Sequence, residues 1–411
     1  MDVRSFGYLV LLSIFAAGCA KSGSKTEEIT TSFETVKCQS AEAIPTEFIV
    51  QWEDGTFSVE KSESPEKFKQ EFVLPRENDI KLVQINQKVR QLGRISQQNI
   101  FIEQSNQYGL EQIEADAVWS QGFRGQNIIV GVVDSRVDVN HRQLRDQIAI
   151  NTRDIPNNGI DDDGNGVVDD TYGAQFFSSA VAGSQLNDHG THVAGIIAAD
   201  PNSGSISGTA PESKIVPSAF LDSSGAGTLG DAILAMQYAA SRGARVINAS
   251  WGGNGCADTL AGALSQLSRQ GILMVVAAGN SGLDVDVYDF FPASFDLSNQ
   301  ITVAASDSIN LMPAWSNNGY KKVHLTAPGV NIFSTGKNNS YLSMDGTSMA
   351  APFVAGAAAS LWSARPQASA GQIKQALLSG VDVISGRNSK TLTRGRLNLR
   401  KSLDELRRIA P

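Results

Sequence analysis

The stretch Asn127 to Asp134, NIIVGVVD, is a run of apolar and β-branched residues that stops at an aspartate. A parallel strand that helices cover on both faces needs such an uninterrupted apolar run. The design recurs in KIVPSAFLD (214–222), RVINASWG (245–252) and ILMVVAAGN (272–280), with helix signals such as LGDAILAMQYAASRG (229–243) between them. The sequence therefore predicts an α/β fold with a doubly wound, mostly parallel sheet and helices on both faces. Polar residues at the strand ends are expected to form the functional site.

The composition narrows the function classes. The chain has 411 residues, more than a single domain usually holds, so a large domain with a smaller one is expected. The formal net charge is −8. No basic stripe is present to neutralise phosphates, which argues against nucleic acid as a partner. A monomer is expected.

The N-terminus has the pattern of an export signal. An apolar run, FGYLVLLSIFAAG, follows Arg4 and ends at Cys19. Its length suits a signal peptide and is short for a membrane span. Small residues before the cysteine resemble a bacterial lipoprotein box, in which Cys19 would carry lipid; the alternative is an ordinary signal peptide in which Cys19 is incidental. We assign residues 1–19 to the signal and the polar residues 20–44 to a tether.

A small α+β unit is predicted at residues 45–103. EFIVQWEDG (47–55), IKLVQI (80–85) and NIFIEQ (99–104) have strand patterns, and SPEKFKQEF (64–72) begins as a helix should. QKVRQLG (87–93) is predicted to be helical. Residues 104–411 form the large domain. Cys19, Cys38 and Cys256 provide no disulfide framework. Cys38 and Cys256 could pair in an oxidising compartment, but free thiols are expected.

Three stretches carry groups for nucleophilic catalysis: Asp134 ends its strand, His189 lies in NDHGTHVAG, and Ser348 lies in GTSMAAP. A serine hydroxyl needs a base, and the base needs an acid to fix its tautomer. The chain order Asp, His, Ser is a known one. Taken singly, Ser348 or Thr347 could simply cap a helix. His189 and His192 could be metal ligands, although no third ligand is evident, and His192 is assigned to structure.

A series of motifs resembles the subtilisin-like serine peptidases. In chain order they are QYGLEQIEADAVWSQGFRGQNIIVGVVDS, HGTHVAG, SGAGT, ASWGG, VVAAGN, LTAPGVNI and GTSMAAPFVAG, and the resemblance extends from about Gln104 to GRLNLRKSL. It implies that Asp134 orients the base, His189 is the general base and acid, and Ser348 is the nucleophile. Asn280, directly after a buried strand, would donate its amide to the oxyanion.

The resemblance also implies how substrate binds. An extended peptide would lie between two strand segments, with Gly225, Ala226 and Gly227 on one side and Ser250, Trp251 and Gly252 on the other. Such backbone pairing is largely indifferent to side chains, which predicts broad peptide specificity. Ala277, Ala278 and Gly279 would wall the pocket for the residue before the scissile bond. Phe290 is expected near its base, where it would favour small side chains.

An acidic stretch, NNGIDDDGNGVVDD (157–170), suggests a structural calcium site. Asp161, Asp163 and Asn165 followed by glycine match the first half of an EF-hand loop. The match then fails, because Tyr172 stands in the twelfth position. Val167 would also contribute an oxygen ligand, and Asp169 or Asp170 would have to complete the ligands. A solvated acidic loop is the alternative.

By the same resemblance, residues 45–103 would be an inhibitory propeptide, with a cut near Glu103 to Asn106. Cys19 would be removed with it, so cleavage would release a membrane-anchored precursor. The sequence as a whole predicts an exported, self-processing serine endopeptidase that acts on peptides and proteins. An inactive subtilase scaffold that only binds is the alternative. An α/β-hydrolase esterase fits neither the residue order nor the absence of a GxSxG stretch around Ser348.

Overall fold

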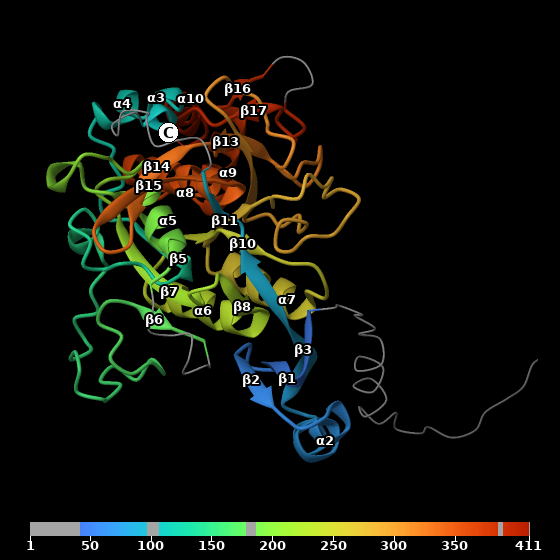
Figure 1. Cartoon of the computed structure of the whole chain (residues 1–411). Coiled ribbons are helices and arrows are strands. Elements are labelled where there is room, and N and C mark those ends of the chain that lie inside the picture. Colours follow the sequence, from blue (N-terminus) through green and yellow to red (C-terminus); the bar gives the residue numbers. More distant parts are fainter. Residues whose placement is uncertain (1–41, 97–106, 178–185, 385–388, 411) are drawn as a thin grey trace, which may run out of the picture.

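The computed structural model describes residues 42–96, 107–177, 186–384 and 389–410 (Figure 1). Its centre is a sheet of nine strands in the order β16-β17-β13-β12-β11-β9-β5-β7-β6. Every neighbouring pair is parallel except β16 and β17. The bounds of these strands are as follows: β5 Ile129–Ser135, β6 Ala174–Gln175, β7 Lys214–Leu221, β9 Val246–Ala249, β11 Leu273–Ala277, β12 Gln300–Ser306, β13 Leu325–Pro328, β16 Asp382–Val383 and β17 Gly395–Arg396. The predicted α/β fold is confirmed.

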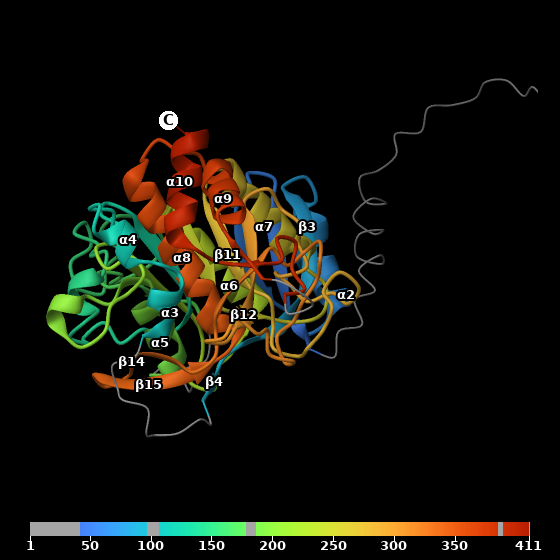
Figure 2. The ribbon, with the colours of Figure 1, turned by 90° about the horizontal axis from the view of Figure 1, so that it is seen from above.

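Helices cover both faces of the sheet, and each face has its own apolar core. One core includes side chains from α5, α8, α9 and α10, and the other includes side chains from α6 and α7. Figure 2 shows α8, α9 and α10 gathered on one side of the molecule. The helix bounds are α3 Tyr108–Gln112, α4 Asp116–Trp119, α5 Asp188–Ala198, α6 Leu229–Ser241, α7 Asp258–Arg269, α8 Thr347–Ala364, α9 Ala370–Ser379 and α10 Leu399–Ile409. Helix α8 is apolar on every side, as a fully buried helix should be.

The N-terminal unit, residues 43–91, is a small antiparallel sheet with a short helix. Its elements are β1 Ala43–Trp52, β2 Phe57–Lys61, α2 Pro65–Phe68 and β3 Ile80–Gln91, and β1 pairs with both other strands. Residues Lys69–Val73 continue the helical turn as a π-helix. One face of the sheet has a small core of its own. The other face packs on α6 and α7, where Ile49, Phe57 and Val89 enter the second core of the large domain (Figure 1).

One predicted element is wrong. QKVRQLG is not a helix, because Gln87 to Gln91 continue β3, and Leu92 and Gly93 lie between β3 and the next strand. Val89 and Leu92 are spaced as on a helix face, yet pairing of β3 with two strand segments of the large domain overrides that local signal. The predicted strand NIFIEQ lies outside the described residues.

The expectation that Cys256 is a free thiol is also wrong, because Cys256 is disulfide-bonded. Cys38 lies outside the described residues, as does the predicted signal with Cys19. Within the described ranges, no helix combines the length and apolar character that a membrane crossing requires.

Candidate active site

The carboxylate of Asp134 and the imidazole of His189 form a buried pair. Asp134 lies near the end of β5, and His189 is the second residue of α5, whose N-cap residue Asn187 accepts from the His189 N–H at 2.9 Å. His189 Nδ1 donates to Asp134 Oδ1 at 2.7 Å, and both side chains are inaccessible to solvent. The carboxylate also accepts from Ser135 N at 2.7 Å, which fixes its orientation. With its proton on Nδ1, the neutral ring presents Nε2 as a base.

Ser348 is the second residue of α8, where free backbone N–H groups and the helix dipole favour negative charge. Its hydroxyl donates to the Ser250 carbonyl at 3.0 Å and does not cap the helix, which begins after Gly346 without a side-chain cap. His189 Nε2 has no hydrogen-bond partner among the described residues.

His192, one helical turn after His189, has a structural environment. Its Nε2 donates to the carbonyls of Ile332 at 2.9 Å and Leu342 at 3.2 Å. Burial lowers the pKa of His192 to about 3, so the ring stays neutral. It therefore holds α5 against the strands β14 (Ile332–Gly336) and β15 (Ser340–Asp345).

Asn280 points its amide at a peptide carbonyl of the same chain. Its Nδ2 donates to the carbonyl oxygen of Leu92, the residue after β3. Its Oδ1 accepts from Thr347 N at 3.0 Å and from Thr347 Oγ1 at 2.9 Å. Thr347 Oγ1 in turn accepts from Gly279 N at 3.1 Å. Since Thr347 occupies the oxygen end of the amide, the nitrogen end must face Leu92; the sequence had suggested only a capping role for this threonine.

The segments predicted to bind substrate hold an extended chain between them. Strand β3 pairs antiparallel with β8 (Ala226–Thr228) on one side and with β10 (Trp251–Gly252) on the other. Gln91 N donates to the Gly225 carbonyl at 2.9 Å, and Leu92 N donates to the Ser250 carbonyl at 3.3 Å. Figure 1 shows β3 reaching from the N-terminal unit to the large domain. The structure therefore brings all six predicted backbone positions to one strand.

Leu92 packs against the predicted pocket. Ala278 and Phe290 belong to an apolar cluster with which the Leu92 side chain is in contact. Ala277 ends β11, and Gly279, with φ +110°, turns the chain so closely past Phe290 and Asn317 that a side chain there would collide with both. Phe290 was expected to restrict the pocket to small side chains. That preference stays a prediction; in this structure the side chain in contact with the cluster is a leucine.

The chain continues past the site as a second short strand. Gly93 follows Leu92, and β4 (Arg94–Ile95) then pairs antiparallel with β15, Arg94 opposite Asp345 (Figure 2). An ideal Cβ built on Gly93 would lie 2.8 Å from His189 Nε2. The peptide bond after Leu92 thus lies between the amide of Asn280 and the base His189. This chain segment accounts for the burial of the site.

The acidic loop is organised around backbone amides. Asp161 and Asp163 both accept from Asn165 N, at 3.1 and 3.2 Å. The Asn165 side chain accepts from Val167 N at 2.9 Å. Asp169 faces a different part of the loop and accepts from the backbone of Asn158 at 3.0 Å. Two carboxylates that share one donor suit a cation that prefers oxygen ligands.

Asp170 borders that pair of carboxylates, since Asn151 Nδ2 donates to both Asp163 and Asp170 and Asn165 Nδ2 donates to Asp170 at 3.0 Å, but it also faces into the domain. It accepts from Tyr238 Oη at 2.7 Å and forms an ion pair with Arg242 at 3.0 Å. Burial opposes ionisation of Asp170, yet the hydrogen bonds and Arg242 hold its pKa below the usual value. In the described parts of the chain, no group of three or more His, Cys, Asp or Glu side chains is arranged to hold a metal.

The buried acid, base and serine on a doubly wound α/β sheet define a serine hydrolase. The chain belongs to the subtilase family, whose model matches residues 125–398. It is 36% identical over 273 residues to subtilisin DY of Bacillus licheniformis, an alignment that covers 66% of this chain and 90% of that protein. It is 39% identical over 290 residues to the thermophilic serine proteinase of Bacillus sp. (strain AK1), covering 69% of this chain and 63% of the relative.

A third relative is the major intracellular serine protease of Bacillus subtilis (strain 168), 33% identical over 278 residues, with 67% of this chain and 81% of that protein covered. Subtilases are serine-type endopeptidases, and this chain is one by family. The predictions of fold and enzyme class are thereby confirmed.

Proposed function

We propose that this protein is an exported, self-processing endopeptidase that cleaves peptide bonds through an acyl-enzyme. Asp134 orients His189, His189 is the general base and acid, Ser348 is the nucleophile, and Asn280 stabilises the oxyanion. The observation that carries the proposal is the peptide carbonyl of Leu92 bound by the Asn280 amide beside His189.

In the proposed reaction, the Ser348 hydroxyl turns from the Ser250 carbonyl to His189 Nε2, loses its proton and attacks the substrate carbonyl carbon. The amide of Asn280 and the N-terminus of α8 stabilise the negative charge on oxygen. His189 then protonates the leaving amine, and water hydrolyses the ester by the reverse proton transfers. Asp134 stabilises the imidazolium in both halves.

Broad specificity for peptides and proteins is part of the proposal. Its support is that β8 and β10 contact β3 through backbone groups, which any non-proline residue offers. The apolar cluster around Ala278 and Phe290 adds a preference for an apolar residue before the cut.

We further propose that residues 1–19 direct export, that Cys19 carries lipid, and that the N-terminal unit is an inhibitory propeptide whose removal releases the enzyme. Support for the last point is that β3 fills the substrate segments. Cys256 is disulfide-bonded and the other cysteines of the chain, Cys19 and Cys38, both precede the cut, so release also requires reduction of that disulfide. Mature enzyme that remains membrane-bound through Cys19 would contradict the release.

Calcium is proposed as a structural ion of the acidic loop, held by Asp161, Asp163, Asn165 and the Val167 carbonyl. The shared donor of Asp161 and Asp163 supports this, and Asp169 or Asp170 would complete the ligands. Asp169 is the better candidate because Asp170 is already paired with the buried Arg242. Asp163 is paired with the exposed Arg153, which would have to give way to the ion. No catalytic cofactor is proposed.

Hydrolysis of a fluorescent casein by the processed enzyme tests the proposal. We expect wild-type protein to cleave casein. Ser348→Ala, processed in trans by wild-type enzyme and then purified from it, should lose the activity by a factor of about 10⁶ while its thermal unfolding is retained. An inactive wild-type protein, processed and folded, would favour the binding scaffold instead.

A further inference from the structure

We infer that Leu92–Gly93 is the peptide bond that this enzyme cleaves in its own chain, and that glycine is the residue its site requires after this cut. The inference rests on the proposed function, since it names the first substrate of the same site. The region where a cut was expected, Glu103 to Asn106, lies outside the described residues and follows this bond.

The residues before the bond are bound as a substrate would be. Lys88, Val89 and Arg90 pair with the three residues of β8, and Arg90 and Gln91 pair with β10. The Gln91 side chain also accepts from Asn187 Nδ2 at 3.1 Å, next to the start of α5. Pairing on both edges fixes the register, because a slip by one residue would turn every side chain to the opposite face.

The register places one carbonyl at the reactive groups. Among the residues described in this segment, Leu92 alone donates its N–H to the Ser250 carbonyl and accepts a hydrogen bond from the Asn280 amide. The Ser348 hydroxyl shares that same Ser250 carbonyl, at 3.0 Å. An ideal Cβ on Gly346, just before α8, would lie 2.5 Å from the Leu92 oxygen. The carbonyl therefore packs against the start of the helix that carries the nucleophile.

Glycine after the bond is required by the position of the base. A Cβ on Gly93 would lie 2.7 Å from His189 Cδ2, 2.8 Å from His189 Nε2 and 3.3 Å from Met349 Cε. His189 cannot move aside without losing its 2.7 Å hydrogen bond to Asp134. The same closeness places Nε2 where it can protonate the nitrogen of Gly93 as that nitrogen leaves.

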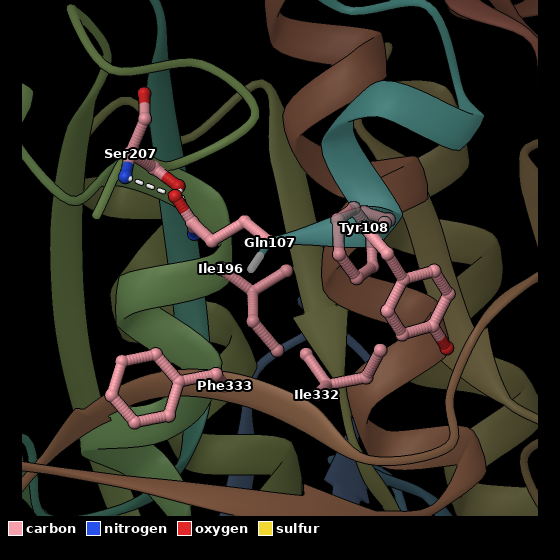
Figure 3. Close-up of a pocket in the computed structure, with 8 residues that line it drawn as sticks. Gln107, Tyr108, Ile196, Ser207, Ile332 and Phe333 are labelled. Carbon is pink, nitrogen blue, oxygen red and sulfur yellow. Dashed lines mark hydrogen bonds between the residues drawn. The ribbon is translucent and has the colours of Figure 1, made fainter. Parts of the chain in front are cut away.

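The chain after the bond is also held in place. Met344 pairs with Ile95, and Ser96 N donates to the Ser343 carbonyl at 3.0 Å. Further on, Gln107 exchanges two hydrogen bonds with the backbone of Ser207, at 2.7 and 2.8 Å, beside a pocket of the large domain (Figure 3). Both sides of the bond are thus anchored to the domain that would cut it.

The reaction balances as a hydrolysis. Ser348 Oγ bonds to the Leu92 carbonyl carbon, the bond to the Gly93 nitrogen breaks, and that amine takes the serine proton from His189. Water then gives its hydroxyl to the Leu92 acyl group and its proton, through His189, back to Ser348. The products are an N-terminal unit ending at Leu92 and an enzyme that begins at Gly93.

The test is time-resolved intact-mass analysis of the precursor from Lys21 to Pro411. Masses are read after reduction because Cys256 is disulfide-bonded. Wild type is compared with Ser348→Ala, Leu92→Asp and Gly93→Ala. Gly371→Ala is the matched control, because a Cβ there would meet its nearest neighbour only at 3.9 Å. A synthetic peptide KVRQLGRIS, the sequence of Lys88 to Ser96, is offered to processed enzyme in parallel.

We expect the first wild-type fragments to end at Leu92 and begin at Gly93, and the peptide to yield KVRQL and GRIS. Leu92→Asp should slow processing more than 100-fold, because a carboxylate would enter an apolar cluster, and Gly93→Ala should slow it roughly tenfold or more. Gly371→Ala should process as wild type does, and Ser348→Ala should stay intact.

Two results would overturn the inference while the proposed function stands: a first cut elsewhere in a wild-type protein that reacts with a fluorophosphonate, or unchanged processing of Leu92→Asp and Gly93→Ala. A wild-type protein that neither cuts itself, nor hydrolyses the peptide, nor takes the label would refute the proposed function and the inference with it.

Discussion

At the scale of single residues, the orientation of Asn280 depends on a neighbour that the motif does not reveal. Asp134, His189, Ser348 and Asn280 were predicted from motifs at strand ends and helix starts, and their roles were taken from the family that those motifs resemble. The role of Thr347 depends on contacts with residues more than sixty positions earlier, so only the folded chain reveals it.

Thr347→Val should lower kcat about tenfold and leave KM nearly unchanged, because the Asn280 amide loses one of the bonds that aim it at the oxyanion. Asn280→Ala should lower kcat by about 10²- to 10³-fold. Thr347→Ser, which keeps the hydroxyl, should restore most of the rate. Steady-state kinetics on the processed enzyme give these values.

This role of Thr347 would be wrong if Thr347→Val lowered kcat as much in the Asn280→Ala background as it does in the wild-type enzyme. A positioning residue must act through Asn280, so the two effects should not be additive.

At the scale of elements, the start of α6 shows what sequence patterns predict and what they miss. LGDAILAMQYAASRG was correctly predicted as a helix, because its apolar periodicity is strong. QKVRQLG was wrongly predicted because seven residues contain too little periodicity to outweigh pairing with two distant strands. The N-terminal unit also covers α6, so that a Cβ on Gly230 would touch Val59. Asp231, near the start of α6, is buried, and burial changes the pKa of its carboxyl group.

Burial raises the pKa of Asp231, the third residue of α6, from 3.8 to about 6, with Glu47 adding to the rise and Lys61 opposing it. The folded precursor therefore binds this proton more tightly than the unfolded chain. The bound proton contributes about 3 kcal/mol to the free energy of unfolding. This contribution is complete below about pH 4 and is lost as the pH rises through about 6.

In the uncut Ser348→Ala background, Asp231→Asn should remove that part of the pH dependence and raise the free energy of unfolding near pH 7. Denaturant unfolding between pH 4 and 7 measures both. If the free energy of unfolding changed with pH in the same way in both proteins, the contact of the N-terminal unit with α6 would not raise the pKa of Asp231.

At the scale of the whole molecule, the N-terminal unit and the large domain are joined by a strand that runs through the active site. The sequence predicted the order of the two units and the architecture of the large one. It did not predict where the strand passes the reactive groups, since that position follows from the register of β3 against β8 and β10. The acidic loop is a separate, peripheral feature of the large domain.

Removal of calcium with EGTA should lower the unfolding temperature of the processed enzyme by several degrees, and added calcium should restore it, because an ion that binds only the folded state stabilises it by mass action. Asp161→Asn should reduce the response. Asp404→Asn, an aspartate on α10 whose side chain is 60% exposed, is the control and should respond as wild type does. If the unfolding temperature did not depend on calcium, the calcium site would be refuted and the acidic loop would be a solvated loop without an ion.

Covalent labelling of the processed enzyme with a fluorophosphonate, followed by peptide mass mapping, tests whether Ser348 is an activated nucleophile. We expect one adduct, on Ser348, that forms rapidly in wild type and is nearly lost in His189→Ala that has been processed in trans by wild-type enzyme, because the serine then lacks its base. An adduct on another residue, or a Ser348 that does not react in folded, processed enzyme, would contradict it.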